Sequence, residues 1–330
     1  MSLKFNRKKA IILSAAVSLG LIVLVLWWYA HANTQHAYLD VDGDSPMAVY
    51  PFKRSIVDFG GGVRFSYDTG AYISTILPAD LRRLKEMGMA VDSVRLPSFG
   101  VDHNYKSFLC SKMYVVELPV YDNKPDSLPE NRTVVGRMRK VIFLPAPTTD
   151  TISTLGVDVI ERFLCRYSPS TRTIAFTNDL PDGYEPLTDI SAESTLATML
   201  GCGKRYYVDM KVENLRHNFF INTSFPRVNV ALPAEDTATV TADLRSSLLV
   251  SKRGSFRAKI LDKAWVQLGD RAGNQSVFFA NTGFPEKYVV NPMNFFQQDV
   301  IIDYPNRRIL LRQLPAMPAS ANVEGKVSVQ

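Results

Sequence analysis

The chain has 330 residues, 46% of them hydrophobic, and a formal net charge of +6. Four basic residues lie before position 10 and the first acid is Asp40, so the rest of the chain carries 34 basic residues against 32 acidic ones, a charge of +2. This small excess excludes the basic footprint of a nucleic-acid-binding protein. The length allows one large domain or two ordinary domains with packed cores.

Residues 10–30 are an uncharged, largely apolar run of 21 residues, about the length that crosses a bilayer as a helix. Lys and Arg residues precede the run and no Lys or Arg follows it until Lys53, so the positive-inside rule predicts a transmembrane signal anchor with a cytoplasmic tail at residues 1–9. A cleaved signal peptide ending near Ala32 remains an alternative. Both interpretations place the body outside the cytoplasm, in a periplasmic or extracellular space.

The segment 31–46 is polar and predicts a linker between the membrane and the first domain. Its acidic stretch from Asp40 to Asp44 resembles the start of a calcium loop, but Pro51 stands where such a loop needs a bidentate acid, so we expect a solvated linker without metal. At the other end, residues 314–330 contain Pro, Ala and Ser without periodicity, which predicts a disordered tail.

The stretch that ends at Asp68 has the pattern of a half-buried strand, because Val63, Phe65 and Tyr67 alternate with polar neighbours. The strand runs directly into Asp68, Thr69 and Gly70. A threonine can hydrogen-bond the turn backbone, and a glycine permits a positive φ and the close approach of another segment. We therefore expect a held carboxylate at a strand end, and an ordinary turn acid is the structural alternative. Asp158 and Asp303, in contrast, are expected to be surface or turn carboxylates. A helix is expected over residues 78–87, which begin with proline and precede Gly88.

The pattern begins again after a turn-rich stretch near residue 180. A strand-like run leads to Asn222, Thr223 and Ser224, 154 residues after Asp68, and Leu-Pro-Ala followed by an acid occurs at positions 77–80 and 232–235. This repeat predicts a first lobe at residues 47–180 and a second lobe at residues 190–313. Asn281, with the Thr-Gly that follows it, is a second candidate for the place of Asn222, although too little chain follows it to complete a lobe.

Two short motifs resemble those of pepsin- and retropepsin-type aspartic peptidases: the loop from Asp68 to Ala71 and the later pair Leu155 and Gly156, followed by a short helix. The resemblance implies an all-β fold, mainly β with short helices, in two pseudo-symmetric lobes. It also implies that Asp68 is the catalytic acid, supported by Thr69 and Gly70, with Ala71, Leu155 and Gly156 as structural residues of the site. Segment 98–104 falls by its order where the family's substrate-covering flap would lie.

The same resemblance implies that each lobe supplies one acid, and that the two carboxylates share a proton and hold a water. The second lobe offers Asn222, with Thr223 and Ser224, in place of an acid. An amide can donate a hydrogen bond but cannot exchange acid and base roles with Asp68, and losing such a group typically costs about 10²- to 10⁴-fold in rate. The second lobe is therefore expected to be degenerate.

These observations predict a membrane-anchored, extracytoplasmic, aspartic-peptidase-like protein that binds an extended peptide or a protein segment between its lobes, with weak or no turnover. Two alternatives remain open. One is an active aspartic endopeptidase that uses Asp68 after dimerisation or with another acid, and the other is a non-catalytic β-rich interaction domain. No cofactor and no metal site is expected, because the four histidines lack ligand spacing. The oligomeric state is left open, as is the choice between one disulfide and three thiols for Cys110, Cys165 and Cys202.

Overall fold

The structure is a computed structural model that describes residues 7–43, 46–101, 107–122, 133–194, 198, 202–224, 229–240, 243–251, 254–281 and 286–313. The expected disordered tail at 314–330 and most of the expected cytoplasmic tail at 1–9 lie outside these residues.

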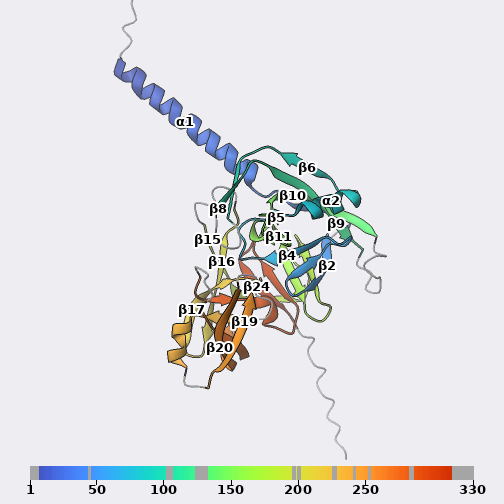
Figure 1. Cartoon of the computed structure of the whole chain (residues 1–330), viewed down its shortest axis with the longest axis vertical. Helices are drawn as coiled ribbons and strands as arrows, with labels where there is room; N and C mark the ends of the chain where they lie inside the picture. Colours follow the sequence, from blue (N-terminus) through green and yellow to red (C-terminus); the bar gives the residue numbers. More distant parts are fainter. Residues whose placement is uncertain are drawn as a thin grey trace, which may run out of the picture.

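Helix α1 (Arg7–Asn33) projects from the body as a single rod (Figure 1). Its 27 residues correspond to a length of about 40 Å. The side chains of residues 12–28 are mostly exposed, including Leu24 and Trp27, and the helix is long and apolar enough to cross a membrane. The expected anchor at residues 10–30 lies within this helix.

The body is built mainly from β-strands, which confirms the predicted fold class of two β lobes with short helices. The first half contains β1 (Tyr38–Val41), β2 (Met47–Lys53), β3 (Ile56–Asp58), β4 (Arg64–Asp68), β5 (Thr75–Ile76), α2 (Pro78–Glu86), β6 (Val91–Val94), β7 (Ser98–Val101), β8 (Ser107–Cys110), β9 (Met113–Tyr121), β10 (Val134–Pro145), β11 (Ser153–Gly156), α3 (Val157–Ile160), β12 (Leu164–Ser168) and β13 (Thr173–Thr177).

The second half contains β14 (Tyr184–Asp189), β15 (Ser191–Glu193), β16 (Arg205–Val212), β17 (Leu215–Ile221), β18 (Val230–Leu232), the 3₁₀ helix η2 (Ala234–Thr239), β19 (Arg245–Ser251), β20 (Gly254–Leu268), β21 (Arg271–Phe279), β22 (Val289–Val290), the 3₁₀ helix η3 (Pro292–Asn294), β23 (Val300–Asp303) and β24 (Arg308–Arg312). Strands β15 to β22 form an eight-stranded sheet of their own. Strands β14, β23 and β24 instead join the 14-stranded sheet, where β23 pairs with β12.

The two halves repeat one arrangement of four strands. In the first half, β11 runs parallel to β4 and antiparallel to β5, and β5 is parallel to β10. In the second half, β22 runs parallel to β17 and antiparallel to β18, and β18 is parallel to β21. Short helices also lie in equivalent places. Helix α2 follows β5 as η2 follows β18, and α3 follows β11 as η3 follows β22. The exact lobe boundaries stay a prediction, since β23 and β24 lie in the sheet of the first half.

The segment after α1 is part of the first lobe instead of a solvated spacer. Strand β1 pairs with β10, so that Tyr38 lies opposite Arg139. Gln35 is buried, and its side-chain amide donates to the backbone oxygen of Ile142 at 2.5 Å and accepts from the Ile142 backbone N–H at 2.9 Å. The same amide donates to the carboxylate of Asp158 at 2.9 Å. Alternating polarity could not reveal these contacts, because they join residues more than a hundred positions apart.

We predict that Gln35→Ala lowers the free energy of unfolding by about 1–3 kcal/mol, because it leaves the buried groups of Ile142 and Asp158 without their partner. His36→Ala is the matched control, since His36 is exposed and its ring contacts His31 at the end of the helix. Denaturant unfolding of the full chain in detergent micelles, followed by circular dichroism, measures both variants. Equal stability of the two variants would contradict the assigned role of Gln35.

Candidate functional site

Asp68 lies at the end of β4, directly beside Gly156 of the parallel strand β11. Strand β4 is anchored by Phe65 and Tyr67, which are fully buried. A Cβ at position 156 would lie 2.7 Å from the carbonyl carbon of Ile73 and 2.9 Å from the backbone oxygen of Ala71, so only glycine allows this approach. Leu155 and Ala71, the neighbours of Gly156 along and across the chain, are also buried. These three residues thus hold the loop that follows Asp68.

Thr69 and Thr223 join the two lobes through reciprocal hydrogen bonds. The Thr69 backbone N–H donates to Thr223 Oγ1 at 3.2 Å, and the Thr223 backbone N–H donates to Thr69 Oγ1 at 3.1 Å. Each hydroxyl also donates to the opposite strand, Thr69 to the backbone oxygen of Ile221 at 2.9 Å and Thr223 to that of Tyr67 at 3.1 Å. Both threonines are buried. The loop after β4 and the loop after β17 therefore meet at one point.

Asp68 and Asn222 occupy equivalent places in these loops. The Gly70 backbone N–H donates to Asp68 Oδ1 at 2.8 Å, and the Ser224 backbone N–H donates to Asn222 Oδ1 at 3.0 Å. The Ser224 hydroxyl adds a second bond to the same oxygen at 2.7 Å. Asn222 also lies against Gly70, because a Cβ at position 70 would be only 2.4 Å from Asn222 Nδ2. Gly70 is therefore required for close approach.

Asn281, the second candidate partner of Asp68, is exposed, and its side chain contacts the Ala234 backbone N–H at 3.4 Å. The Thr-Gly pair after it lies outside the described residues. The structure thus places Asn222 beside the Asp68 loop.

Asp158 forms a buried polar link behind the Asp68 loop. Its carboxylate accepts from Ser74 Oγ at 2.7 Å and from Gln35 at 2.9 Å, and Ser74 Oγ accepts from the Gly156 backbone N–H at 2.9 Å. Burial raises the pKa of Asp158 to about 6, against the opposing effect of the bonds from Ser74 and Gln35. The expectation that Asp158 is a surface or turn carboxylate was wrong; its place in the apolar run Val-Asp-Val-Ile of α3 was the available signal.

Asp303 was also expected to be a surface or turn carboxylate. It is fully buried but serves the turn after β23, where it accepts from the Asn306 backbone N–H at 3.0 Å and from Arg308 Nε at 2.8 Å. It has no part in the site.

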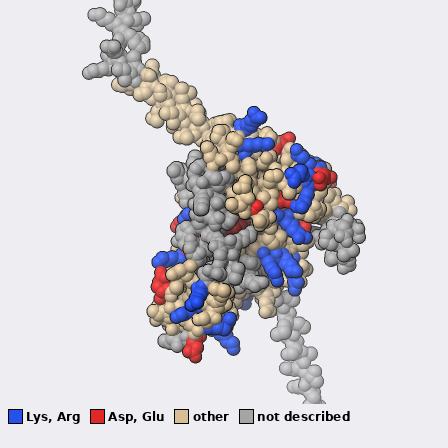
Figure 2. Space-filling model, in the orientation of Figure 1, with Lys and Arg blue, Asp and Glu red and all other residues tan. Residues whose placement is uncertain are grey.

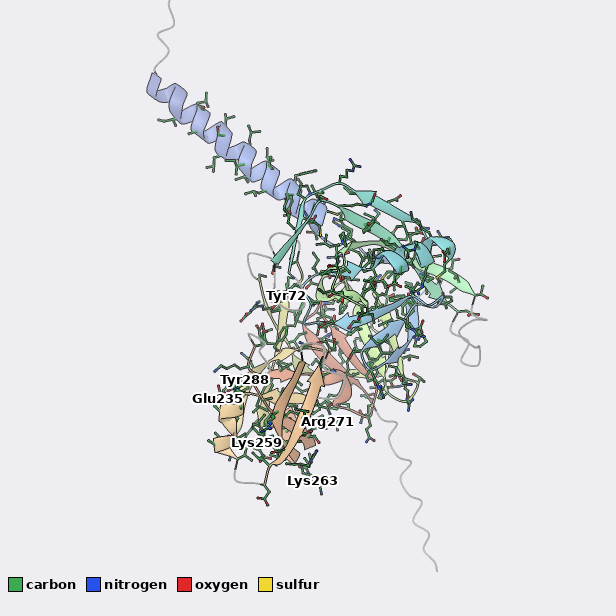
Figure 3. The ribbon with its side chains drawn as sticks, in the orientation of Figure 1. Tyr72, Glu235, Lys259, Lys263, Arg271 and Tyr288 are labelled. Carbon is green, nitrogen blue, oxygen red and sulfur yellow. The ribbon has the colours of Figure 1, made fainter. Side chains whose placement is uncertain are left out.

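Tyr72 connects the loop after Asp68 with the second lobe, and it lies at the junction of the two halves in Figure 3. Its hydroxyl donates to the Glu286 carboxylate at 3.4 Å, and the Arg205 guanidinium lies 5.1 Å from the centre of its ring. Arg205 also pairs with Glu286 at 3.3 Å. Burial and the charge of Glu286 raise the pKa of Tyr72, so it remains a neutral phenol. No motif of the sequence indicated this cluster.

The segment expected to act as a flap begins with β7, which pairs with β8 so that Ser98 lies opposite Cys110. Residues 102–104 of that segment lie outside the described residues, and its role stays a prediction. The three cysteines are free thiols, with Cys165 and Cys202 buried, and burial raises the pKa of each of these two to about 12.

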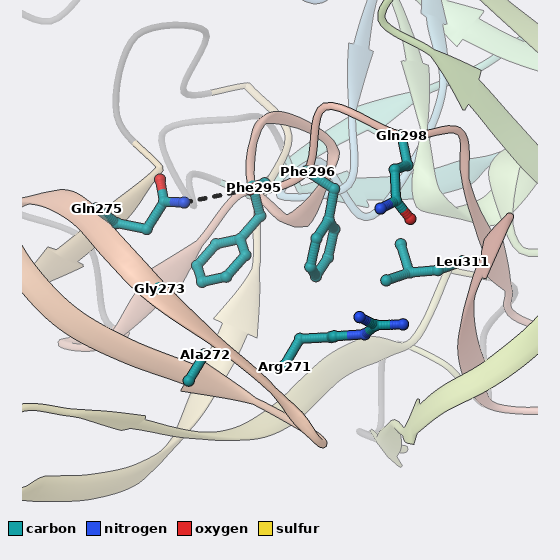
Figure 4. Close-up of a pocket in the computed structure, with 8 residues that line it drawn as sticks. All are labelled: Arg271, Ala272, Gly273, Gln275, Phe295, Phe296, Gln298 and Leu311. Atoms are coloured by element: carbon teal, nitrogen blue, oxygen red, sulfur yellow. Dashed lines mark hydrogen bonds between the residues drawn. The ribbon is translucent and has the colours of Figure 1, made fainter. Parts of the chain in front are cut away.

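A cavity of about 170 Å³ lies between β21, the segment after η3 and β24 (Figure 4). Phe295 and Phe296 form one wall, and Gln275 Nε2 donates to the Phe295 backbone oxygen at 3.2 Å. The other lining residues are Arg271, Ala272, Gly273, Gln298 and Leu311. The volume is below that of typical small-molecule sites, about 300–1,000 Å³, and the lining contains neither an acid nor a histidine. The loops of Asp68 and Asn222 therefore remain the candidate site.

No family model and no curated protein matches this chain. Solved structures that resemble it include edgp (12% identity, TM-score 0.44, covering 80% of this chain and 94% of that one). Basic 7S globulin from soybean gives 11% identity and a TM-score of 0.48, covering 81% and 94%. Conglutin gamma, a basic 7S globulin from lupine seeds, gives 9% and 0.43, covering 84% and 94%.

The predicted membership of the pepsin- and retropepsin-type peptidase family is therefore wrong. No family model supports it, and the structural likenesses are to edgp and two 7S globulins at identities of 9–12%. The physical reason lies in what the short motifs encode. Asp-Thr-Gly and Leu-Gly specify a close approach of loops and strands, which the structure contains, and such an approach does not require a catalytic pair.

We predict a strong coupling between positions 70 and 222. Gly70→Ala should lower the free energy of unfolding by more than 1 kcal/mol because its Cβ overlaps the Asn222 amide, a cost typical of overpacking. In an Asn222→Ala background the same change should cost much less, since the overlapping atoms are gone. A double-mutant cycle from denaturant unfolding measures the difference. Additive effects would show that the two loops do not touch.

We also predict that Asp158 makes stability depend on pH. A folded-state pKa of about 6 lies above the unfolded value of about 3.9, so the contribution is present below about pH 4 and is lost as the pH rises through 6. Relative to Asp158→Asn, the wild-type free energy of unfolding should fall by about 2 kcal/mol between pH 4 and pH 7. Unfolding curves at several pH values test this, and parallel profiles would contradict the buried-acid assignment.

Proposed function

We propose that this chain is a membrane-attached, non-catalytic β-rich interaction domain. Its body faces the periplasmic or extracellular side, with the N-terminus in the cytoplasm, and it takes a protein segment or an extended peptide between the two lobes. The apolar helix α1 and the basic residues before it support the attachment and this orientation.

The observation that carries the proposal is the fixed amide at position 222. Its oxygen accepts two hydrogen bonds from Ser224, which leaves the Nδ2 group, a donor only, on the side of Gly70. General acid–base hydrolysis needs two groups that exchange a proton within one turnover, and an amide does not titrate. Asn222, which stands in the second lobe where Asp68 stands in the first, therefore cannot supply the second titratable group for that chemistry.

The same pair suits recognition of a peptide group. A carboxylate oxygen accepts a hydrogen bond from an N–H, and an amide nitrogen donates one to a carbonyl, so Asp68 and Asn222 together offer both halves of the match. An extended segment bound between two β lobes would add main-chain hydrogen bonds to this pair. The reciprocal bonds of Thr69 and Thr223 hold the pair without a ligand, which reduces the entropic cost of binding.

We predict that the full chain in detergent cleaves no member of a random peptide library at acid or neutral pH, as read by mass spectrometry. Asp68→Ala and Asn222→Asp are assayed beside it. Cleavage by the wild type that disappears in Asp68→Ala would overturn the proposal. Cleavage only by Asn222→Asp, and not by that variant carrying Asp68→Ala as well, would show that the amide is what prevents turnover.

Affinity selection from the same library on the immobilised full chain tests binding. Asp270→Ala is the matched control, because Asp270 is an exposed acid in the turn between β20 and β21. Selected peptides should bind this control as they bind the wild type and should bind Asp68→Ala more weakly. Equal binding by both variants would place the ligand elsewhere on the molecule.

A further inference from the structure

The end of α1 is packed into the first lobe as one unit with it. Tyr29 and Ala32 pack against a buried apolar cluster that includes Leu96 and Met113. Asn33 Oδ1 accepts from Ser98 Oγ at 2.6 Å, and two residues later Gln35 is buried in the lobe. No flexible spacer therefore separates the helix from the lobe. Because the two move as one unit, the same face of the lobe always surrounds the end of the helix.

Four residues form the surface around this junction, which we call the junction rim: Val94, Arg95, Leu109 and Lys112. Leu109 is 73% exposed and Val94 is 44% exposed, although both are apolar. Strand register places Val94 opposite Met113 and Cys110 opposite Ser98. The junction rim thus directly adjoins the residues that contact the helix. Figure 2 shows basic side chains beside the point where the helix meets the body.

The junction rim lies at a depth set by the helix. Trp27 and Trp28 are exposed near the end of the apolar run, where aromatic residues favour the interface between lipid and water. Ala32, which packs on the lobe, is four residues further along, or about 6 Å. The headgroup layer is itself about 5–7 Å thick on each side of the hydrocarbon core. A helix that spans the bilayer therefore brings the junction rim to the level of the headgroups.

We propose that the junction rim is a lipid-contact surface that docks the first lobe on the bilayer. Leu109 and Val94 reach into the headgroup layer, and Arg95 and Lys112 contact anionic headgroups. Apolar tips flanked by basic side chains are the combination by which peripheral surfaces bind such membranes. This inference rests on the proposed membrane attachment, and it holds for either orientation of the chain. Docking would fix the loops of Asp68 and Asn222 at a set height above the lipid.

The test places a fluorescent label at Leu109→Cys in the full chain, with Cys110→Ser to prevent labelling next to it. The chain is held in nanodiscs of phosphatidylcholine and phosphatidylglycerol that contain a headgroup-linked quencher. Leu248→Cys is the matched control, because Leu248 is 61% exposed on β19, which lies at the opposite end of the body from α1 (Figure 1). Gly20→Cys, in the open middle of the helix, reports insertion through a hydrocarbon-depth quencher.

We expect loss of fluorescence at Leu109→Cys and none at Leu248→Cys. The double change Arg95→Glu and Lys112→Glu should reduce the loss at Leu109→Cys, whereas Lys259→Glu with Lys263→Glu, at the far end of the body in Figure 3, should not.

Quenching at Gly20→Cys without quenching at Leu109→Cys would overturn the docking and leave the attachment standing. A label at position 109 that is shielded from water but not quenched by lipid would indicate a protein partner and overturn the proposal too. Failure at Gly20→Cys would reject the attachment itself.

Discussion

The reciprocal hydrogen bonds between Thr69 and Thr223 are the contact on which the site depends. Each hydroxyl accepts from the backbone N–H of the opposite loop and donates to the strand that precedes that loop, and the two threonines are 154 positions apart in sequence. The atoms are buried, so a missing partner would leave backbone groups without hydrogen bonds at a cost of about 1–3 kcal/mol each. This arrangement places Asp68 and Asn222 in equivalent positions and lets Asn222 lie against Gly70.

The site has an acid, Asp68, in one half and an amide, Asn222, in the other. The shape of each loop needs only a side-chain oxygen that accepts a hydrogen bond from the backbone N–H two residues later. Asp68 and Asn222 both provide such an oxygen. Proton exchange needs two titratable groups. The same fold can therefore retain the approach of the loops without hydrolytic chemistry, which is why the short motifs resembled a peptidase family that the comparisons did not support.

The parts of the fold that follow local rules could be predicted from the sequence. The strand before Asp68, the helix that starts at Pro78 and the apolar helix at the N-terminus depend on periodicity and on start signals, and each forms as expected. The repeated Leu-Pro-Ala phrase also marks equivalent places, since it leads into α2 in one half and η2 in the other.

The contacts that were missed join distant residues. Gln35 lies in a polar segment that predicted a spacer, and Asp158 lies just after a strand motif, where a surface or turn acid was expected. Their shared hydrogen bond and their burial exist only once β1 pairs with β10. The cluster of Tyr72, Arg205 and Glu286 has the same origin, since it forms where the two halves meet. Local patterns carry no information on which distant polar groups will be neighbours.

The central claim is that two loops from different halves are joined at Thr69 and Thr223, and the most direct measurement is a double-mutant cycle of Thr69→Val and Thr223→Val. Denaturant unfolding of the full chain should show each single variant losing about 1–3 kcal/mol of unfolding free energy, and the double variant losing much less than the sum, because both changes break the same set of bonds. Small losses that add would contradict the account, since they would mean that the two hydroxyls do not meet.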